Sequence, residues 1–314
     1  MNSVGTIAYV AVCAMAALAL AGCPRDVPEI GDATGPPTDA PVSACVSIPP
    51  QAFLLERIGG ERIVLEVLVG PGQSPHTYEP TPAQMVALER ADLYFRIGVS
   101  FEDTLIGRIE QTMPALEIVD LRDNIELRHL PTHAHGPDQD HVSHGEKDPH
   151  IWLDPKLMTV QARTVADALS RADPDGADLY EGALNSLIDD IEQLDETLHE
   201  LLAPVRGRQM FVFHPAFGYF AEAYGLEQVA IEVEGKEPGA RQLQGIVEQA
   251  RDREVKAIFV QPEFSQVAAR AVAREIGAEV VIIDPLARDY LQNMHQIARK
   301  VSEALGGERG GGDG

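Results

Sequence analysis

The sequence predicts an α/β protein with two lobes, each built on a parallel sheet, joined by one long helix. The chain has 314 residues, which is enough for about two domains of ordinary size. Short apolar segments alternate with segments of helical periodicity, as expected for β-α-β units whose strands pair in parallel. Between the two alternating halves, one segment has the apolar spacing of a helix of about 26 residues.

Composition narrows the possible partners. Hydrophobic residues make up 45% of the chain and charged residues 24%, which is normal for a globular protein with real cores. The formal net charge is −24, and no stretch of the sequence gathers Lys and Arg into a basic stripe. Because phosphate binding needs such clusters, we expect no nucleic-acid partner. An acidic surface is compatible with cations, or with solubility alone.

Residues 1–22 are predicted to be a lipoprotein signal peptide. The segment MNSVGTIAYVAVCAMAALALAGC is an uncharged apolar run that ends in small residues. Its close, Leu20-Ala21-Gly22-Cys23, resembles a bacterial lipobox, in which the cysteine is lipidated and becomes the mature N-terminus. No Lys or Arg precedes the run, which departs from the usual pattern. A transmembrane helix is the alternative, for which the run is at the short limit. We expect Cys23 to anchor an extracytoplasmic protein to a membrane.

Residues 23–49 are predicted to be a flexible tether after the lipidated cysteine, because they are rich in Pro, Asp, Gly and Ser. Of the three cysteines, Cys13 lies in the signal and Cys23 carries the lipid, so Cys45 is left alone. No intrachain disulfide or cysteine-based zinc site can then form. Any metal must be bound by histidines and carboxylates.

Residues 50–172 form the predicted N-terminal lobe. Its expected strands are 62–69, 92–97 and 116–121, and its expected helices are 51–59, 81–89 and 155–171. Residues 173–204 form the linking helix, which Pro204 ends. Its apolar positions recur in steps of four and three, which places them on one continuous stripe: Tyr180, Leu184, Leu187, Ile191, Leu194, Leu198 and Leu201. A helix of this length exceeds one lobe and is better explained as a connection between two.

Residues 205–307 form the predicted C-terminal lobe, and residues 308–314 a disordered tail. The expected strands are 209–213, 228–233, 257–260 and 279–283, and the expected helices are 216–224, 240–253, 265–276 and 290–305. The sequence contains no G-x-S-x-G elbow, phosphate-binding loop, dinucleotide fingerprint or H-E-x-x-H helix. We therefore predict that the protein is not an enzyme.

Four residues stand out as candidate metal ligands. His76 follows the strand RIVLEVLV, His214 directly follows QMFVF, Asp284 directly follows EVVII, and His150 lies in KDPHIWLDP before a helix. Ligands of open α/β sheets bind at the carboxyl ends of strands. Each residue has a simpler explanation, as a solvated loop histidine, a hydrogen-bonded buried imidazole or a helix cap. Together, three imidazoles and one carboxylate suit one tetrahedral cation in a cleft between the lobes.

The chain resembles the zinc/manganese solute-binding lipoproteins of bacterial metal-uptake ABC transporters. The matching segments cover residues 50–305 in order: PGQSPHTYEPTPAQM, ADLYFRIGVSFED, DPHIWLDP, FHPAFGYFAEAYG, EGKEPGARQL, IFVQPEFS and VVIIDPLARDY. The resemblance implies two Rossmann-like lobes and a rigid linking helix, with one metal clamped between the lobes. It places the ligands on His76, His150, His214 and Asp284. It also implies a monomer that delivers its metal to a membrane permease and catalyses nothing.

The ligand set favours zinc. Manganese-type members of that family carry a carboxylate at the position of His214, whereas three imidazoles and one aspartate make a nitrogen-rich site, which suits Zn²⁺ better than Mn²⁺. Mn²⁺ stays the alternative cargo. A metallohydrolase is the rival enzyme class, and it would need an open position for water and a nearby base. An adhesin is a third class, for which the sequence shows no marked surface.

Residues 129–146 form a histidine-rich segment that precedes His150. It is too irregular for a helix or strand, because Gly and Asp interrupt it. The resemblance implies an auxiliary loop that collects metal with lower affinity through five histidines, namely His129, His133, His135, His141 and His144. The alternative is a solvated polar loop that contains histidines incidentally.

Overall fold

The computed structural model describes residues 40–130, 147–232, 244, 245, 247, 248, 250, 251, 255–264 and 266–306. All of them belong to one compact unit, residues 38–314, which is distinct from residues 1–37. The predicted signal peptide, Cys23 and the tail after residue 306 lie outside the described residues. Within the described residues, no helix has both the length and the apolarity that crossing a membrane requires.

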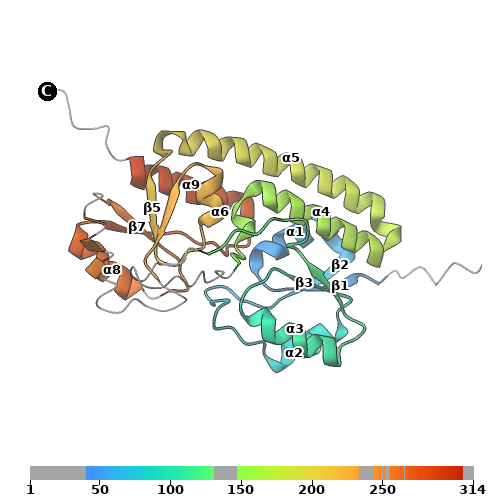
Figure 1. Cartoon of the computed structure of the whole chain (residues 1–314). Coiled ribbons are helices and arrows are strands. Elements are labelled where there is room, and N and C mark those ends of the chain that lie inside the picture. The colour runs from blue at the N-terminus through green and yellow to red at the C-terminus, as the bar shows by residue number, and fades with distance from the viewer. Residues whose placement is uncertain are drawn as a thin grey trace, which may run out of the picture. The chain divides into compact units, whose positions relative to one another are not determined.

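The N-terminal lobe contains a sheet of four parallel strands in the order β2-β1-β3-β4. Its helices lie on both sides of the sheet in the chain order expected of β-α-β units (Figure 1). The strands are β1 (Val42–Val46), β2 (Ile63–Val67), β3 (Leu93–Arg96) and β4 (Glu117–Asp120). The helices are α1 (Pro49–Gly59), α2 (Pro82–Arg90) and α3 (Phe101–Thr112).

The C-terminal lobe repeats this topology with four parallel strands in the order β6-β5-β7-β8. In each lobe the strand order reverses beside the first strand, which places a crevice at the carboxyl ends of the central strands. The strands are β5 (Gln209–Val212), β6 (Glu227–Ala230), β7 (Ala257–Val260) and β8 (Glu279–Ile282). The helices are α6 (Gly218–Ala223), α8 (Gln266–Ile276) and α9 (Tyr290–Gly306). The helix predicted over 240–253 lies largely outside the described residues.

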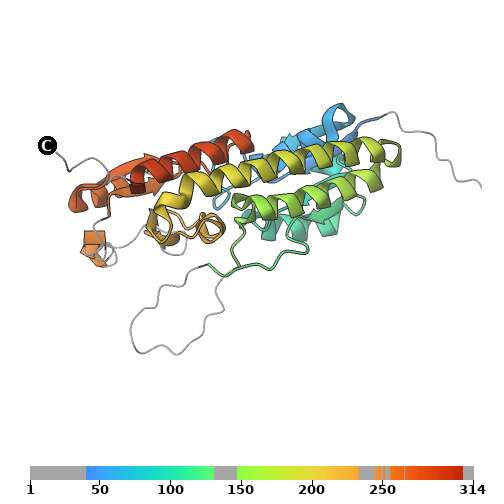
Figure 2. The same cartoon turned by 90° about the horizontal axis from the view of Figure 1, so that it is seen from above.

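The predicted linking helix is confirmed as α5 (Ala177–Leu202), which has 26 residues and is therefore about 39 Å long. It begins after the short turn η3 (Pro174–Gly176) and ends at the turn η4 (Ala203–Val205), which contains Pro204. The helix packs against α4 (Pro155–Ala172) and α1 on the N-terminal side and against α9 on the C-terminal side (Figures 1 and 2). One rigid element thus contacts both lobes.

The predicted tether over 23–49 is wrong from Val42 onward. Residues 42–46, VSACV, form β1, the central strand between β2 and β3, and Pro49 begins α1. A short strand that is buried on both faces shows no alternation, and prolines at the start of a helix are easily mistaken for a linker. Within β1, Cys45 is a buried free cysteine, and burial raises the pKa of its thiol to about 12. The helix α3 was not predicted.

Truncation at the N-terminus tests the placement of β1. A chain that begins at Ala40 is expected to unfold cooperatively, because it keeps every strand. A chain that begins at Ile48 is expected to lose cooperative unfolding, because β2 and β3 each pair with β1 and would lose that partner. Thermal unfolding followed by circular dichroism measures both, and an equally cooperative transition in the shorter chain would contradict the assignment.

Candidate metal site

Three histidines meet at the carboxyl ends of the two sheets. His76 lies in the loop after β2, His150 precedes the turn η2 (Ile151–Leu153), and His214 follows β5. The Nε2 atom of His214 lies 3.0 Å from Nε2 of His76 and 3.4 Å from Nε2 of His150. The ligand atoms of all three lie within 4.8 Å of one another, and no other such group of three potential ligands occurs in the described residues.

The spacing of the three nitrogens matches a tetrahedral zinc ion. Zn–N bonds of about 2.0–2.1 Å at tetrahedral angles separate two ligand nitrogens by about 3.3–3.4 Å. The separations of 3.0 Å between His214 and His76 and 3.4 Å between His214 and His150 are close to that value. The three rings come from both lobes, so a cation bound here bridges them.

Two carboxylates fix the orientation of two of the rings. Nδ1 of His150 lies 2.7 Å from Oδ1 of Asp148, and Nδ1 of His214 lies 3.2 Å from Oε2 of Glu232. Since a carboxylate only accepts, each Nδ1 carries the hydrogen, which leaves the Nε2 lone pair free for a metal. Both imidazoles are 5% exposed, and both carboxylates are buried. The tautomer required for metal binding is therefore built into the fold.

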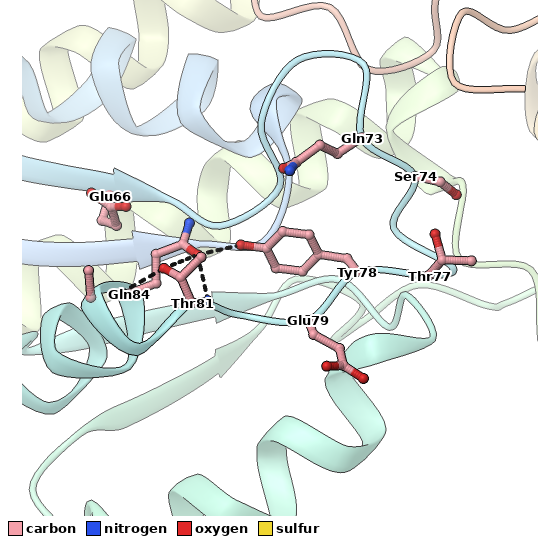
Figure 3. Close-up of a pocket in the computed structure, with 9 residues that line it drawn as sticks. Glu66, Gln73, Ser74, Thr77, Tyr78, Glu79, Thr81 and Gln84 are labelled. Atoms are coloured by element: carbon pink, nitrogen blue, oxygen red, sulfur yellow. Dashed lines mark hydrogen bonds between the residues drawn. The ribbon is translucent and has the colours of Figure 1, made fainter.

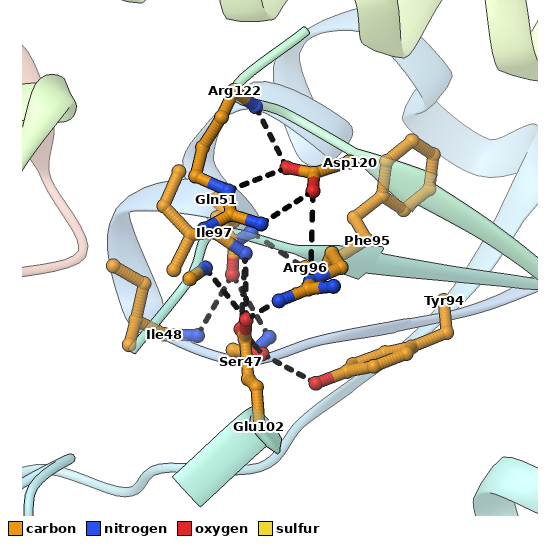
Figure 4. A network of polar contacts seen from close by, with 11 residues as sticks. Ser47, Ile48, Gln51, Tyr94, Phe95, Arg96, Ile97, Glu102, Asp120 and Arg122 are labelled. Carbon is orange, nitrogen blue, oxygen red and sulfur yellow. Dashed lines mark hydrogen bonds and ion pairs between the residues drawn. The ribbon is translucent and has the colours of Figure 1, made fainter. Parts of the chain in front are cut away.

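His76 is held by a hydroxyl group instead of a carboxylate. Its Nδ1 lies 3.2 Å from Oγ of Ser100, in the loop between β3 and α3. The carboxylate of Glu102 anchors that loop by accepting hydrogen bonds from the backbone N–H groups of Ile97, at 2.9 Å, and Gly98, at 2.6 Å (Figure 4). Burial raises the pKa of Glu102, although these hydrogen bonds oppose the shift.

The loop that carries His76 is also anchored on its other side. Oη of Tyr78 donates to Oε1 of Gln84 at 2.6 Å, and Nε2 of Gln84 donates to the carbonyl of Leu68 at 2.8 Å. The ring of Tyr78 packs edge-on against Phe101, 5.0 Å between centroids. A polar surface pocket of about 560 Å³ lies beside these residues (Figure 3). None of the three histidines lines it, so it is separate from the metal site.

Aromatic side chains wall the site. The ring of Phe264 stacks on His214, 4.9 Å between centroids, and the ring of Trp152 lies 5.2 Å from that of His150. Nε1 of Trp152 donates to the carbonyl of Pro285 at 2.7 Å, which ties the N-terminal lobe to the C-terminal lobe beside the site. Exclusion of water strengthens the attraction between a cation and its ligands.

Residues 45–304 match the family described as the periplasmic component A of the zinc-uptake complex, ZnuA. The chain belongs to this family. The crystal structure of a ZnuA deletion mutant with zinc bound shares 36% identity and a TM-score of 0.78, and the match covers 86% of this chain and 100% of that one.

Two further relatives are named for different metals. The high-affinity zinc uptake system protein ZnuA of Yersinia pestis is 28% identical over 266 residues, covering 79% of this chain and 84% of the relative. The manganese-binding lipoprotein MntA of Halalkalibacterium halodurans is 29% identical over 231 residues, covering 72% and 73%. The match to the ZnuA family shows that the chain has the two-lobed α/β fold of binding proteins that take part in metal uptake.

Asp284 is not part of the histidine group. It follows β8, as predicted, and its Oδ1 accepts a hydrogen bond from the backbone N–H of Leu286 at 2.8 Å. Burial, with a smaller contribution from the charge of Asp284, raises the pKa of Glu263 to about 7. Asp284 therefore acts on Glu263, which directly precedes Phe264, the residue whose ring stacks on His214.

Most of the histidine-rich segment lies outside the described residues, including His133, His135, His141 and His144. His129 is described, and its Nε2 lies 3.2 Å from Nζ of Lys147, with which it forms an isolated antiparallel bridge. This bridge closes the base of the segment. His129 is therefore separate from the group formed by His76, His150 and His214.

Sequence reasoning missed the residues that hold the three imidazoles. Asp148 stands two positions before His150 and could have been found as the aspartate of the DPH motif. Ser100 and Glu232 are 24 and 18 positions from the histidines that they contact, and only the fold brings them together. Their sequence contexts, GVSFED and AIEVEG, carry no signal of that role.

Two of the three imidazoles are held in their neutral form. Burial, together with the neighbouring His214 and His150, lowers the pKa of His76 to about 3. Burial also lowers the pKa of His214, although the hydrogen bond to Glu232 opposes the shift. Neutral imidazole is the form that binds metal, so the folded chain presents these ligands ready for binding.

These shifts predict how the stability of the metal-free protein depends on pH. In the unfolded chain both histidines have pKa values near 6.5, so below about pH 6.5 the unfolded state binds more protons than the folded state. Stability therefore falls as the pH decreases below about 6.5, and the contribution of His76 stops changing below about pH 3. Between pH 7 and pH 5, the free energy of unfolding of the metal-free protein should decrease by about 1 kcal/mol less in His76→Gln than in wild type. This is about half of what the full pKa shift of His76 would give, because the ring is partly exposed.

Urea unfolding in the presence of a chelator, at pH 7 and pH 5, measures this difference. Wild type and His76→Gln are compared, with zinc-loaded wild type as the control in which metal occupies the nitrogens. The same loss of stability in both metal-free proteins would contradict the assignment of His76 as a neutral buried imidazole.

Proposed function

We propose that this ZnuA-family chain captures Zn²⁺ outside the cytoplasm and delivers it to an ABC-type permease, with no reaction catalysed. The observation that carries the proposal is that the Nε2 atoms of three histidines converge at a spacing close to that of a tetrahedral zinc site. The Nδ1 atom of each ring contacts a serine hydroxyl or a carboxylate on the opposite side of the ring. Family membership and the zinc-bound ZnuA relative support the same cargo.

Zinc is favoured over manganese by the chemistry of the donors. Three imidazole nitrogens suit Zn²⁺, whereas Mn²⁺ prefers sites dominated by carboxylate oxygens. Among the described residues, the one group of three potential ligands consists of histidines alone. The relative MntA is named for manganese, so Mn²⁺ is the competing cargo that an experiment must include.

Asp284 is the proposed fourth ligand. It stands at the carboxyl end of β8, on the same sheet edge as Phe264, which stacks on His214. A carboxylate in the fourth position fills a tetrahedral site and leaves no place for a reactive water, which a zinc hydrolase requires. Coordination by Asp284 therefore distinguishes a carrier from a hydrolase.

Membrane attachment through a lipid on Cys23 completes the proposal, with the protein acting as a monomer. The supporting feature is the segment Leu20-Ala21-Gly22-Cys23 after an apolar run. One relative, MntA, is named a lipoprotein.

The histidine-rich segment is proposed to collect zinc near the site with lower affinity, through His129, His133, His135, His141 and His144. The base of the segment is attached next to the ligands. His129 pairs with Lys147, and Asp148, which holds His150, follows directly. Ions gathered by the segment are thereby concentrated close to the triad.

Competition titrations test the function. A soluble chain from Ala40 is titrated with Zn²⁺ and Mn²⁺ against a chromogenic chelator. We expect one tight zinc equivalent that Mn²⁺ does not displace, plus weaker equivalents.

His214→Ala should weaken the tight equivalent at least about 100-fold, or about 2.7 kcal/mol. Asp284→Asn should weaken it while keeping the stoichiometry. Replacement of residues 131–146 by two glycines should remove only the weaker equivalents.

The matched control is His295→Ala, which removes an exposed histidine on α9 and should change nothing. Tight zinc binding that survives His214→Ala would overturn the assignment of the site. Unaltered binding by Asp284→Asn would leave the fourth position to another group, and unchanged stoichiometry after loop replacement would exclude the auxiliary role.

A further inference from the structure

Glu232 is a buried carboxylate with one oxygen engaged and the other unpartnered. The residue is 3% exposed, and its Oε2 lies 3.2 Å from Nδ1 of His214. Its Oε1 has no hydrogen-bond partner among the described residues. The backbone N–H of Glu232 donates to the carbonyl of Phe213 at 2.8 Å, which fixes its position beside the strand end that carries His214.

Burial of such a carboxylate does not help the fold by itself. A charged group removed from water destabilises the folded state unless it is paired and fully hydrogen-bonded. In the part of the chain that the structure describes, the only ion-pair partner of Glu232 is the ring of His214, which a buried site keeps neutral. The position of Glu232 therefore calls for a positive charge near His214, which a bound cation supplies.

The other carboxylate of the site differs in this respect. Asp148 holds His150 through Oδ1, while its Oδ2 lies 3.8 Å from Nη1 of Arg128. The negative charge of Asp148 is thus opposed by a guanidinium group. Among the described residues, Glu232 has no Lys or Arg within ion-pair distance, and its carboxylate contacts His214 instead.

We propose that Glu232 is a positioning residue that sets the preference of the site for zinc over manganese. It keeps the hydrogen on Nδ1 of His214, and its negative charge strengthens electron donation by Nε2. This inference rests on the proposed function, because it requires the three histidines to bind the metal. It goes beyond the ligand set by assigning metal selectivity to a residue that does not touch the metal.

The selectivity follows from the chemistry of the two ions. Bonds to imidazole nitrogen are stronger for Zn²⁺ than for Mn²⁺, in line with the ordering of divalent metals, so stronger donation by the nitrogen benefits Zn²⁺ more. The charge of Glu232 also supports the binding of either ion, because Zn²⁺ and Mn²⁺ carry the same charge. Three neutral imidazoles leave both positive charges of the ion uncompensated, Asp284 as a ligand neutralises one of them, and Glu232 supplies the second negative charge. The preference for Zn²⁺ therefore rests on the donation by the imidazole nitrogen.

The test is Glu232→Gln, which keeps the shape and an acceptor oxygen for Nδ1–H but removes the charge. The matched control is Glu227→Gln, which makes the same change on an exposed residue of the neighbouring strand β6. Kd values for Zn²⁺ and Mn²⁺ are measured by chelator competition. Thermal unfolding of the metal-free proteins is measured in parallel. Zinc affinity should fall about 10–100-fold in Glu232→Gln and manganese affinity less, so the ratio of the two narrows.

The metal-free Glu232→Gln protein should unfold at the same temperature as wild type or higher, since it no longer buries a charge that the described residues leave without a Lys or Arg partner. A purely structural role would instead lower that temperature and weaken both metals equally, and this result overturns the inference. An unchanged ratio of affinities with tight zinc binding also overturns it while leaving the proposed function intact. Failure of the wild type to bind one zinc tightly would defeat the proposed function itself.

Discussion

Three imidazole Nε2 atoms face one another in this protein because a polar side chain contacts the Nδ1 atom of each ring. Asp148, Glu232 and Ser100 provide those contacts. Without the carboxylates of Asp148 and Glu232, the rings of His150 and His214 could rotate or carry their hydrogen on Nε2, where it would block a metal. The hydroxyl of Ser100, which can donate or accept, positions the ring of His76. The Nε2 atom of His214 lies 3.0 Å from that of His76 and 3.4 Å from that of His150. The metal-free fold therefore already holds the three nitrogens near the spacing that a bound cation requires.

The lobes hold this arrangement because they are tied along a stiff frame. α5 packs against α1 and α4 in one lobe and against α9 in the other. Beside the site, Trp152 donates to the carbonyl of Pro285, and Arg288 forms an ion pair with Glu56 across the lobes. Any movement that separates His76 or His150 from His214 must break contacts of this kind. Such a frame favours small local rearrangements at the site over wide rotation of the lobes.

How far the sequence predicts this molecule depends on how local each signal is. The stripe on α5 repeats along one segment, so periodicity predicted the helix and its length, with bounds of 173–204 against the observed Ala177–Leu202. The three histidines were found because each follows a recognisable strand or motif. β1 escaped because five apolar and small residues among prolines resemble a linker, although the strand lies at the centre of its sheet. Glu232 escaped because its contact with His214 forms only once β5 and β6 are paired. Asp284 was predicted as a residue at a strand end, and it lies just after β8, outside the histidine group.

Zinc K-edge X-ray absorption on the loaded chain, with residues 131–146 replaced by two glycines, tests the central claim most directly. The outer-shell scattering pattern of imidazole reports how many histidines bind the ion. The account predicts one zinc per chain with three imidazole nitrogens at about 2.0–2.1 Å and the remaining position filled by oxygen. A first shell with one imidazole or none, completed by oxygens, would contradict the claim that His76, His150 and His214 form the zinc site.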